Sequence, residues 1–254
     1  MTRAFFSWDH LQMRYEPFPI GLARPLVDAE TYREMVEAFP PLERFSTLSK
    51  VGDKYSLGEK FGVKEFQEFV RSHPLWREFH AWVKSRDFVR GVLDALRERH
   101  VDLGFDLDSP RRSLLRKRFA DALRGGSRIG SLLLSSRFEF SMLPARGGHV
   151  LPHTDGASKC VTLVVSMLRE GEWDASWGGG TDVNRPKDPR LSFNRLNQQL
   201  GFDDMEVIDT YAFEPNQAVV FVKTFNSWHS VRPMTGPDSA PMRRTLTINI
   251  ETPT

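Results

Sequence analysis

The second half of the chain, from residue 128 onward, constrains the fold more than any other feature. Its segments are extended and are broken by Gly, Pro and Asn, whereas the first half has helical periodicity. Five segments are predicted to be strands: 131–143, 160–168, 211–213, 218–222 and 243–251. Many strands of moderate length after a run of helices favour a mainly β core with a helical buttress, which means a sandwich or jelly roll.

The first half predicts helices that brace this core. Asp28 is expected to cap a helix that ends at Pro40 and Pro41, and residues 63–100 continue the helical pattern with Pro74 in a first turn. Residues 17–23 read as a short strand. The basic stretch 111–128 could meet an anionic partner, but its apolar spacing favours a solvated amphipathic helix.

The change of texture near residue 128 is interpreted as a change of layer within one domain. We therefore expect a single domain over 1–254, with a helix-rich support over 1–127 and a β core over 128–254. Residues 173–184 and 186–204 read as longer connections between strands.

Composition excludes several classes of protein. A net charge of +2 is too weak to indicate a nucleic-acid partner, and no apolar run is long enough to span a membrane. The N-terminus lacks the apolar core of a secretory signal, and the single cysteine, Cys160, excludes an internal disulfide. We expect a cytoplasmic protein; its oligomeric state is left open. Cys160 lies in an apolar run and is predicted to be a buried small hydrophobe.

Two histidines and an aspartate are the candidate metal ligands. His153 and Asp155 are two residues apart, and in a strand such residues point to one side. His229 follows the apolar strand 218–222 and is placed to be the third ligand. Two imidazoles and one carboxylate on one face of a metal are typical of non-haem Fe(II) oxygenases. His149 is a rival ligand, but it lies outside the pairing with Asp155.

Arg243 and Thr245 form a candidate anion site at the start of the last strand. Alternation places Arg243, Thr245, Thr247 and Asn249 on one face of that strand. A guanidinium followed by a hydroxyl suits a carboxylate, as a dicarboxylic co-substrate would require. The adjacent Arg244 is a competing anchor.

Together these motifs resemble those of a known family. His153-Thr-Asp155, then His229, then Arg243-x-Thr245 is similar to the pattern of the iron- and 2-oxoglutarate-dependent dioxygenases, in particular the bacterial prolyl-hydroxylase-like branch. The glycine turn before His153 and the tryptophan–glycine loop 172–179 also resemble that branch. The likeness covers about residues 128–251 well and the front of the chain loosely.

The resemblance implies a double-stranded β-helix that uses Fe(II), 2-oxoglutarate and O2. His153, Asp155 and His229 would then bind iron, and Arg243 with Thr245 would bind the far carboxylate of 2-oxoglutarate. The expected reaction is hydroxylation of a C–H bond in a small metabolite, a sugar-containing intermediate or a peptide side chain, with release of succinate and CO2. Where many relatives have a tyrosine before the first ligand, this chain has Ser141 and Met142.

Two other functions are compatible with the same metal ligands, and further residues are candidates for contact with the substrate. The same triad could serve a zinc hydrolase, and a jelly roll could be a binding module without catalysis. The hydrolase leaves Arg243 and Thr245 without a task, and the intact triad with its arginine argues against a module that has lost catalysis, because such a site is expected to lose one of the four residues. Substrate contacts are expected among polar residues near the motifs: Arg137, Glu139, Ser141, Lys159 and Asn226.

Overall fold

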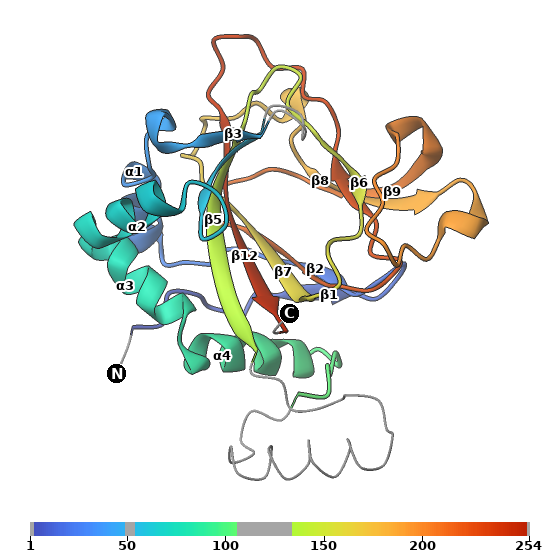
Figure 1. Cartoon of the computed structure of the whole chain (residues 1–254), viewed down its shortest axis with the longest axis horizontal. Helices are drawn as coiled ribbons and strands as arrows, with labels where there is room; N and C mark the ends of the chain where they lie inside the picture. Colours follow the sequence, from blue (N-terminus) through green and yellow to red (C-terminus); the bar gives the residue numbers. More distant parts are fainter. Residues whose placement is uncertain (1–2, 49–53, 106–133, 253–254) are drawn as a thin grey trace.

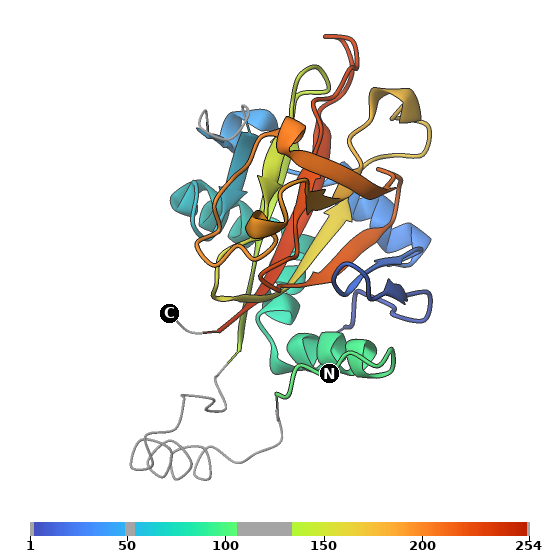
Figure 2. The same ribbon diagram turned by 90° about the vertical axis from the view of Figure 1, so that its right-hand side faces the viewer.

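Two antiparallel sheets face each other in the computed structural model, which describes residues 3–48, 54–105 and 134–252. The larger sheet has the spatial order β1 (Gln12–Arg14), β2 (Ile20–Ala23), β10 (Ala218–Val222), β7 (Lys159–Ser166), β12 (Arg243–Glu251), β5 (Ser135–Leu143), β4 (Lys54–Gly58) and β3 (Ser46–Leu48). The smaller sheet has the order β6 (Val150–His153), β11 (His229–Val231), β8 (Thr181–Pro186) and β9 (Met205–Tyr211). Figure 2 looks toward the smaller sheet.

From β5 onward the chain passes back and forth between the two sheets. β5, β7, β10 and β12 lie in the larger sheet, while β6, β8, β9 and β11 lie in the smaller one. Four strands in each sheet, with this alternation, make a jelly roll, which is the double-stranded β-helix expected from the sequence. The predicted fold class is confirmed.

Four helices accompany the sheets in the described residues: α1 (Ala29–Glu37), α2 (Val63–Ser72), α3 (Pro74–Val83) and α4 (Arg86–Arg97). Asp28 caps α1 as predicted, because its carboxylate accepts a hydrogen bond from the N–H of Thr31. Pro74 occupies the first turn of α3, and Ser85 caps α4. Short 3-10 turns occur at Leu42–Arg44, Ala175–Trp177, Pro189–Leu191 and Phe202–Asp204.

Helices α1 to α3 cover the face of the larger sheet that points away from the smaller sheet (Figure 1). Aromatic side chains make this contact: the ring of Trp76 in α3 lies 4.7 Å from that of Phe140 in β5. Along β12, Leu246, Ile248 and Ile250 pack into the same core. The alternate residues of β12 therefore face the space between the sheets, as predicted.

The strands of the smaller sheet differ most from the sequence-based expectation. β8 occupies 181–186, which was read as part of a connection, and β9 spans 205–211 where a strand was expected only at 211–213. The basic stretch 111–128 and the boundary near residue 128 lie outside the described residues. No helix in the described part of the chain is long and apolar enough to cross a membrane.

Candidate metal centre and its cavity

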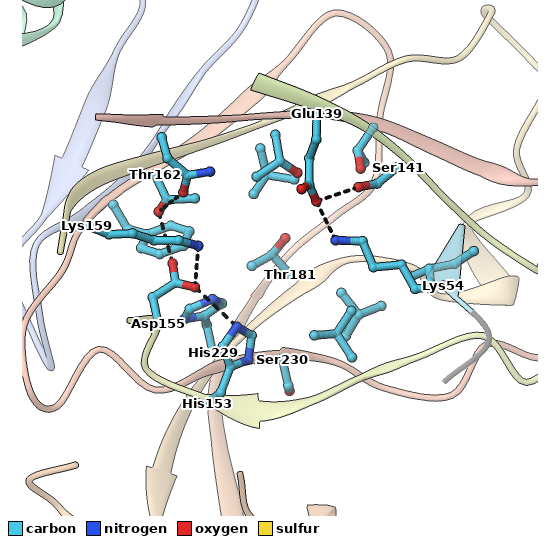
Figure 3. Close-up of a pocket in the computed structure, with 18 of the residues that line it drawn as sticks. Lys54, Glu139, Ser141, His153, Asp155, Lys159, Thr162, Thr181, His229 and Ser230 are labelled. Atoms are coloured by element: carbon cyan, nitrogen blue, oxygen red, sulfur yellow. Dashed lines mark hydrogen bonds and ion pairs between the residues drawn. The ribbon is translucent and has the colours of Figure 1, made fainter. Parts of the chain in front are cut away.

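A polar cavity lies between the two sheets and is lined by residues from both. The larger sheet contributes side chains of β4, β5, β7, β10 and β12, and the smaller sheet contributes β6, β8 and β11. Figure 3 shows Glu139, Ser141 and Lys54 grouped across the cavity from His153, Asp155 and His229. The cavity therefore brings together residues that are far apart in the sequence.

His153 and His229 meet because their strands pair. β6 and β11 are antiparallel, and the two histidines are direct cross-strand partners, so both imidazoles project from one face. Their ring centroids are 4.3 Å apart. Each ring places Nδ1 at 2.9 Å from the carbonyl oxygen two residues earlier, Leu151 for His153 and Ser227 for His229. If Nδ1–H donates to that carbonyl, the Nε2 lone pair is left for the cavity.

Asp155 reaches the histidines through a turn and not through strand alternation. β6 ends at His153, and Asp155 lies in the following loop with a left-handed backbone of φ 70°. The expected strand geometry for His153 and Asp155 is therefore wrong, because the turn and not strand alternation directs the carboxylate. Asp and Asn tolerate this region better than most residues. The Oδ1 atom of Asp155 lies 3.4 Å from Nε2 of His153.

The second oxygen of Asp155 is fixed by the larger sheet. Thr162 in β7 donates a hydrogen bond of 3.0 Å from its hydroxyl to Oδ2 of Asp155. The hydroxyl also lies 3.1 Å from Oδ1 of Asn249 in β12. Because one hydroxyl has a single hydrogen to donate, an Asn249 amide turned to donate to Thr162 would satisfy all three groups. The carboxylate is thus held with Oδ1 toward the histidines.

Electrostatics keep Asp155 ionised and His229 neutral. Burial raises the pKa of Asp155, but the ammonium of Lys159 and the two histidines outweigh it and hold that pKa well below its usual range. Burial, with His153 nearby, lowers the pKa of His229 to about 3. At neutral pH the site therefore presents a carboxylate and an unprotonated His229, which are the forms that bind metal.

The donor set fits a divalent transition metal. One ligand atom from each of His153, Asp155 and His229 lies within 4.8 Å of the other two. Two imidazole nitrogens and one carboxylate oxygen suit Fe(II) or Zn²⁺, and three protein ligands leave further positions open to water or substrate.

Arg243 is a buried cation that, in the described part of the chain, lacks an acidic partner. Its side chain lines the cavity, the residue is 5% exposed, and its Nε donates a hydrogen bond of 2.6 Å to the carbonyl of Gly179. The guanidinium lies 4.7 Å above the ring of Phe213. Burial lowers the pKa of Arg243 to about 10, so it stays protonated at neutral pH. Within the described residues no carboxylate lies at ion-pair distance from it.

Arg244, the competing anchor, points away from the cavity. Its guanidinium forms an ion pair of 2.6 Å with Glu172 and packs over the ring of Phe39. Thr245, by contrast, is buried and lines the cavity beside Arg243. The geometry therefore leaves Arg243 with Thr245 as the pair that can receive an anion.

The other residues expected near the substrate divide into two groups. Arg137, Glu139, Ser141 and Lys159 line the cavity. Asn226 does not; its amide donates a hydrogen bond of 2.8 Å to the carbonyl of Pro17, so it holds a turn. His149, the rival ligand, also lies outside the lining, with its ring near Phe202.

The lining also includes residues that the sequence motifs do not indicate, among them Lys54, Thr162 and Thr181. Alternation along 160–168 could have placed Thr162 opposite the apolar Val161 and Leu163. Lys54 carries no such signal, because it begins a short strand, β4, far from the motifs. Its ammonium lies 2.6 Å from Oε1 of Glu139. Burial raises the pKa of Glu139, but Lys54 and Arg137 outweigh it and lower that pKa overall.

Comparisons with known proteins find similar solved structures but no match in sequence. No family model matches the sequence, and no curated protein matches it. A Pseudomonas putida prolyl-4-hydroxylase structure is similar at 14% identity and TM-score 0.46, over 92% of each chain. A Trichoplax adhaerens prolyl hydroxylase bound to a hypoxia-inducible factor peptide gives 12% identity and TM-score 0.45, over 92% of this chain and 83% of that one. The α-ketoglutarate-dependent epimerase SnoN from nogalamycin biosynthesis gives 11% identity and TM-score 0.46, over 94% of this chain and 78% of that one.

Proposed function

We propose that this chain is an Fe(II)- and 2-oxoglutarate-dependent dioxygenase. It would hydroxylate a C–H bond of a small metabolite, a sugar-containing intermediate or a peptide side chain. The observation that carries the proposal is one cavity holding both the His153–Asp155–His229 cluster and the buried guanidinium of Arg243, which has no carboxylate at ion-pair distance among the described residues. A metal and a dicarboxylate would each find a site there whose charge and donors match it.

Each residue has a defined task in this proposal. His153, Asp155 and His229 would hold Fe(II) through Nε2, Oδ1 and Nε2. Backbone carbonyls orient the two imidazoles, and Thr162 orients the carboxylate. With O2 and 2-oxoglutarate, bound iron would supply oxidative decarboxylation to succinate and CO2 coupled to hydroxylation of the substrate.

Arg243 would bind the far carboxylate of 2-oxoglutarate, with Thr245 as a further hydrogen-bond donor. The carbonyl of Gly179 fixes Nε of the guanidinium and the ring of Phe213 supports its face, so the rest of the fork is left for the co-substrate. Apolar side chains of Val164, Phe221 and Val231 also line the cavity and help to exclude water around the triad.

The alternative functions explain fewer of these contacts. A zinc hydrolase would use the same three ligands and an activated water, but it would leave a buried cation with no task. A binding module without catalysis would not require two imidazoles and a carboxylate directed at one point. A hydrolase would add no anion to the Gly179 carbonyl and the Phe213 ring that stabilise the buried charge of Arg243.

The test is anaerobic addition of Fe(II) and 2-oxoglutarate, followed by absorption spectroscopy. A keto acid chelated to Fe(II) gives a visible charge-transfer band, and we expect this band only when both components are present. Tight retention of zinc with no visible band would favour the hydrolase. Asp155→Asn should remove the band.

A further inference from the structure

Lys159 enters the cavity because of a β-bulge in β7. Glu251 pairs with Lys159 and Ile250 with Val161, so the register shifts by one residue and Cys160 is the extra residue. Cross-strand partners share a face, which places Val161 with the core residue Ile250 and Lys159 with Glu251. Without the bulge, alternation would direct Lys159 and Val161 to the same side. The bulge thus aims a lysine at the candidate metal site.

Each of the other cations that line the cavity already has an anionic partner, either in the protein or in the proposed co-substrate. Lys54 pairs with Glu139, and Arg137 forms two hydrogen bonds to Oε1 of Glu251, at 2.8 and 3.0 Å. Arg243 is reserved for the co-substrate by the proposed function. Lys159 differs from these three cations, because its partner, Asp155, is a proposed metal ligand.

The only anion at ion-pair distance from Lys159 in the described structure is a proposed metal ligand. Its Nζ lies 2.7 Å from Oδ1 of Asp155, and that oxygen is also the one facing Nε2 of His153. A divalent metal bound to Oδ1 would take over this carboxylate and repel the ammonium. The Lys159 side chain is only 18% exposed, so bulk water would screen the repulsion poorly.

Resting on the proposed metal site, we propose that Lys159 is a metal-dependent anchor for an anionic substrate. Once metal occupies the triad, the ammonium exchanges Asp155 for a carboxylate or phosphate group of the substrate, beside the C–H bond to be oxidised. The substrate class is therefore an acid, and a neutral sugar or an uncharged side chain would lack the charge that this position requires.

A neighbouring lysine strengthens the assignment. The backbone N–H of Lys223 donates to the carbonyl of Cys160, so Lys223 follows β10 directly beside the bulge. Its ammonium donates to the carbonyl of Thr224 and, among the described residues, has no carboxylate at ion-pair distance. Lys223 lies outside the cavity lining, with its ammonium over the ring of Phe225, but its charge still acts on Asp155 and Lys159. It therefore adds to the positive potential around Lys159 once Asp155 is shared with a metal.

The test uses calorimetry on the intact chain with Mn²⁺, 2-oxoglutarate and sulfate as the oxyanion probe, at constant ionic strength. Sulfate should bind the wild type only after Mn²⁺ and 2-oxoglutarate are saturating. Lys159→Met should weaken sulfate by about tenfold or more, because a charge-assisted hydrogen bond is lost. The same variant should bind Mn²⁺ roughly tenfold more tightly, because a competing cation is removed.

Two controls separate the possible causes. Lys64→Met removes a charge from an exposed position on α2 and should leave both affinities unchanged. Lys159→Arg should restore sulfate binding, which a folding defect would not allow.

Three results would overturn the inference: no metal-dependent sulfate binding in the wild type, unchanged sulfate affinity in Lys159→Met, or a loss confined to 2-oxoglutarate. The last would mean that Lys159 serves the co-substrate. Failure of the proposed metal site is recognised separately from the Mn²⁺ titration, because the wild type would then bind Mn²⁺ no more tightly than Asp155→Asn; the three results count against Lys159 when Mn²⁺ does bind.

Discussion

At the residue scale, the candidate metal site depends on a backbone conformation that few side chains adopt. Asp155 has φ 70° and is 5% exposed, with its carboxylate between the ammonium of Lys159 and the hydroxyl of Thr162. Left-handed backbone in a non-glycine residue is sustained only when the surroundings compensate for it. Here the compensation is the set of contacts that direct Oδ1 toward the two histidines.

Asp155→Asn tests the charge of this residue without changing its backbone preference. Asparagine tolerates a left-handed backbone as well as aspartate does, so the fold should survive. Mn²⁺ affinity should fall by about a hundredfold or more, because a neutral amide replaces the only carboxylate in the triad. Calorimetry provides the measurement, and Asp238→Asn, an exposed carboxylate, is the matched control. Equal metal affinity in the variant and the wild type would remove Asp155 from the site.

Arg243 and Arg244 can be separated by matched substitutions. Arg243→Met should weaken 2-oxoglutarate by roughly a hundredfold in the Mn²⁺-loaded protein while metal stays bound, since two charge-assisted hydrogen bonds are lost. Arg244→Met removes the ion pair with Glu172 and the cation–π contact with Phe39, neither of which lines the cavity, and should leave this affinity intact. The reverse pattern would show that the anion site was assigned to the wrong arginine.

At the element scale, the loop between β7 and β8 positions Arg243, the proposed anion site. Gly179 has φ 87°, its carbonyl accepts from Nε of Arg243, and a Cβ on it would lie 3.1 Å from both Met234 and Trp173. The preceding Gly178 has φ 81°, but a Cβ there would meet nothing within 4 Å. Both positions require a left-handed backbone, and only one of them is also crowded.

Alanine substitutions at these two glycines should therefore differ. Gly178→Ala should cost about 1 kcal/mol of stability through backbone strain alone. Gly179→Ala should cost more and should also weaken 2-oxoglutarate, because crowding displaces the carbonyl that holds Arg243. Thermal unfolding and calorimetry measure the two effects. Similar losses in both variants, with unchanged 2-oxoglutarate affinity, would mean that the loop does not position the arginine.

The same elements show which parts of the molecule the sequence predicts. β10 and β12 have the bounds expected, because each carries a plain apolar or alternating pattern. β8 carries no such pattern, since it buries polar residues: Asp182 is 1% exposed and bonds to Arg232 and Thr210. When the buried side chains of a strand are polar and hydrogen-bonded to one another, the sequence lacks the apolar alternation by which a strand is predicted.

The residues of the cavity likewise divide into those that a sequence motif indicates and those that only the three-dimensional structure places there. The short motifs pointed to His153, Asp155, His229 and Arg243 as candidates, because each residue type carries its own chemistry. Lys159 was proposed only for its spacing from Asp155, whereas its entry into the cavity depends on a bulge. A register shift depends on pairing with β12 and leaves no mark in the local sequence.

At the scale of the whole molecule, burial of the triad between two sheets links stability to pH. Burial lowers the pKa of His229 from 6.5 to about 3 in the folded chain. Between those values the unfolded chain binds more protons, so stability should fall as pH drops from about 6.5 toward 3. The lowered pKa of Asp155 adds to this loss below the ordinary pKa of an aspartate, about 4.

His229→Asn tests this linkage in metal-free protein. The variant lacks the buried imidazole, so its unfolding free energy should fall less between pH 6.5 and pH 5 than that of the wild type. Urea unfolding at a series of pH values provides the curves. Parallel curves for the two proteins over this range would show that His229 is not the group responsible.

The central claim is that one cavity binds both the metal and the co-substrate. The most direct test is anomalous diffraction from crystals grown without oxygen in the presence of Fe(II) and 2-oxoglutarate. We expect an iron peak at bonding distance from Nε2 of His153, Oδ1 of Asp155 and Nε2 of His229, with the far carboxylate of 2-oxoglutarate on Arg243. Iron bound elsewhere, or 2-oxoglutarate bound away from Arg243, would contradict the account.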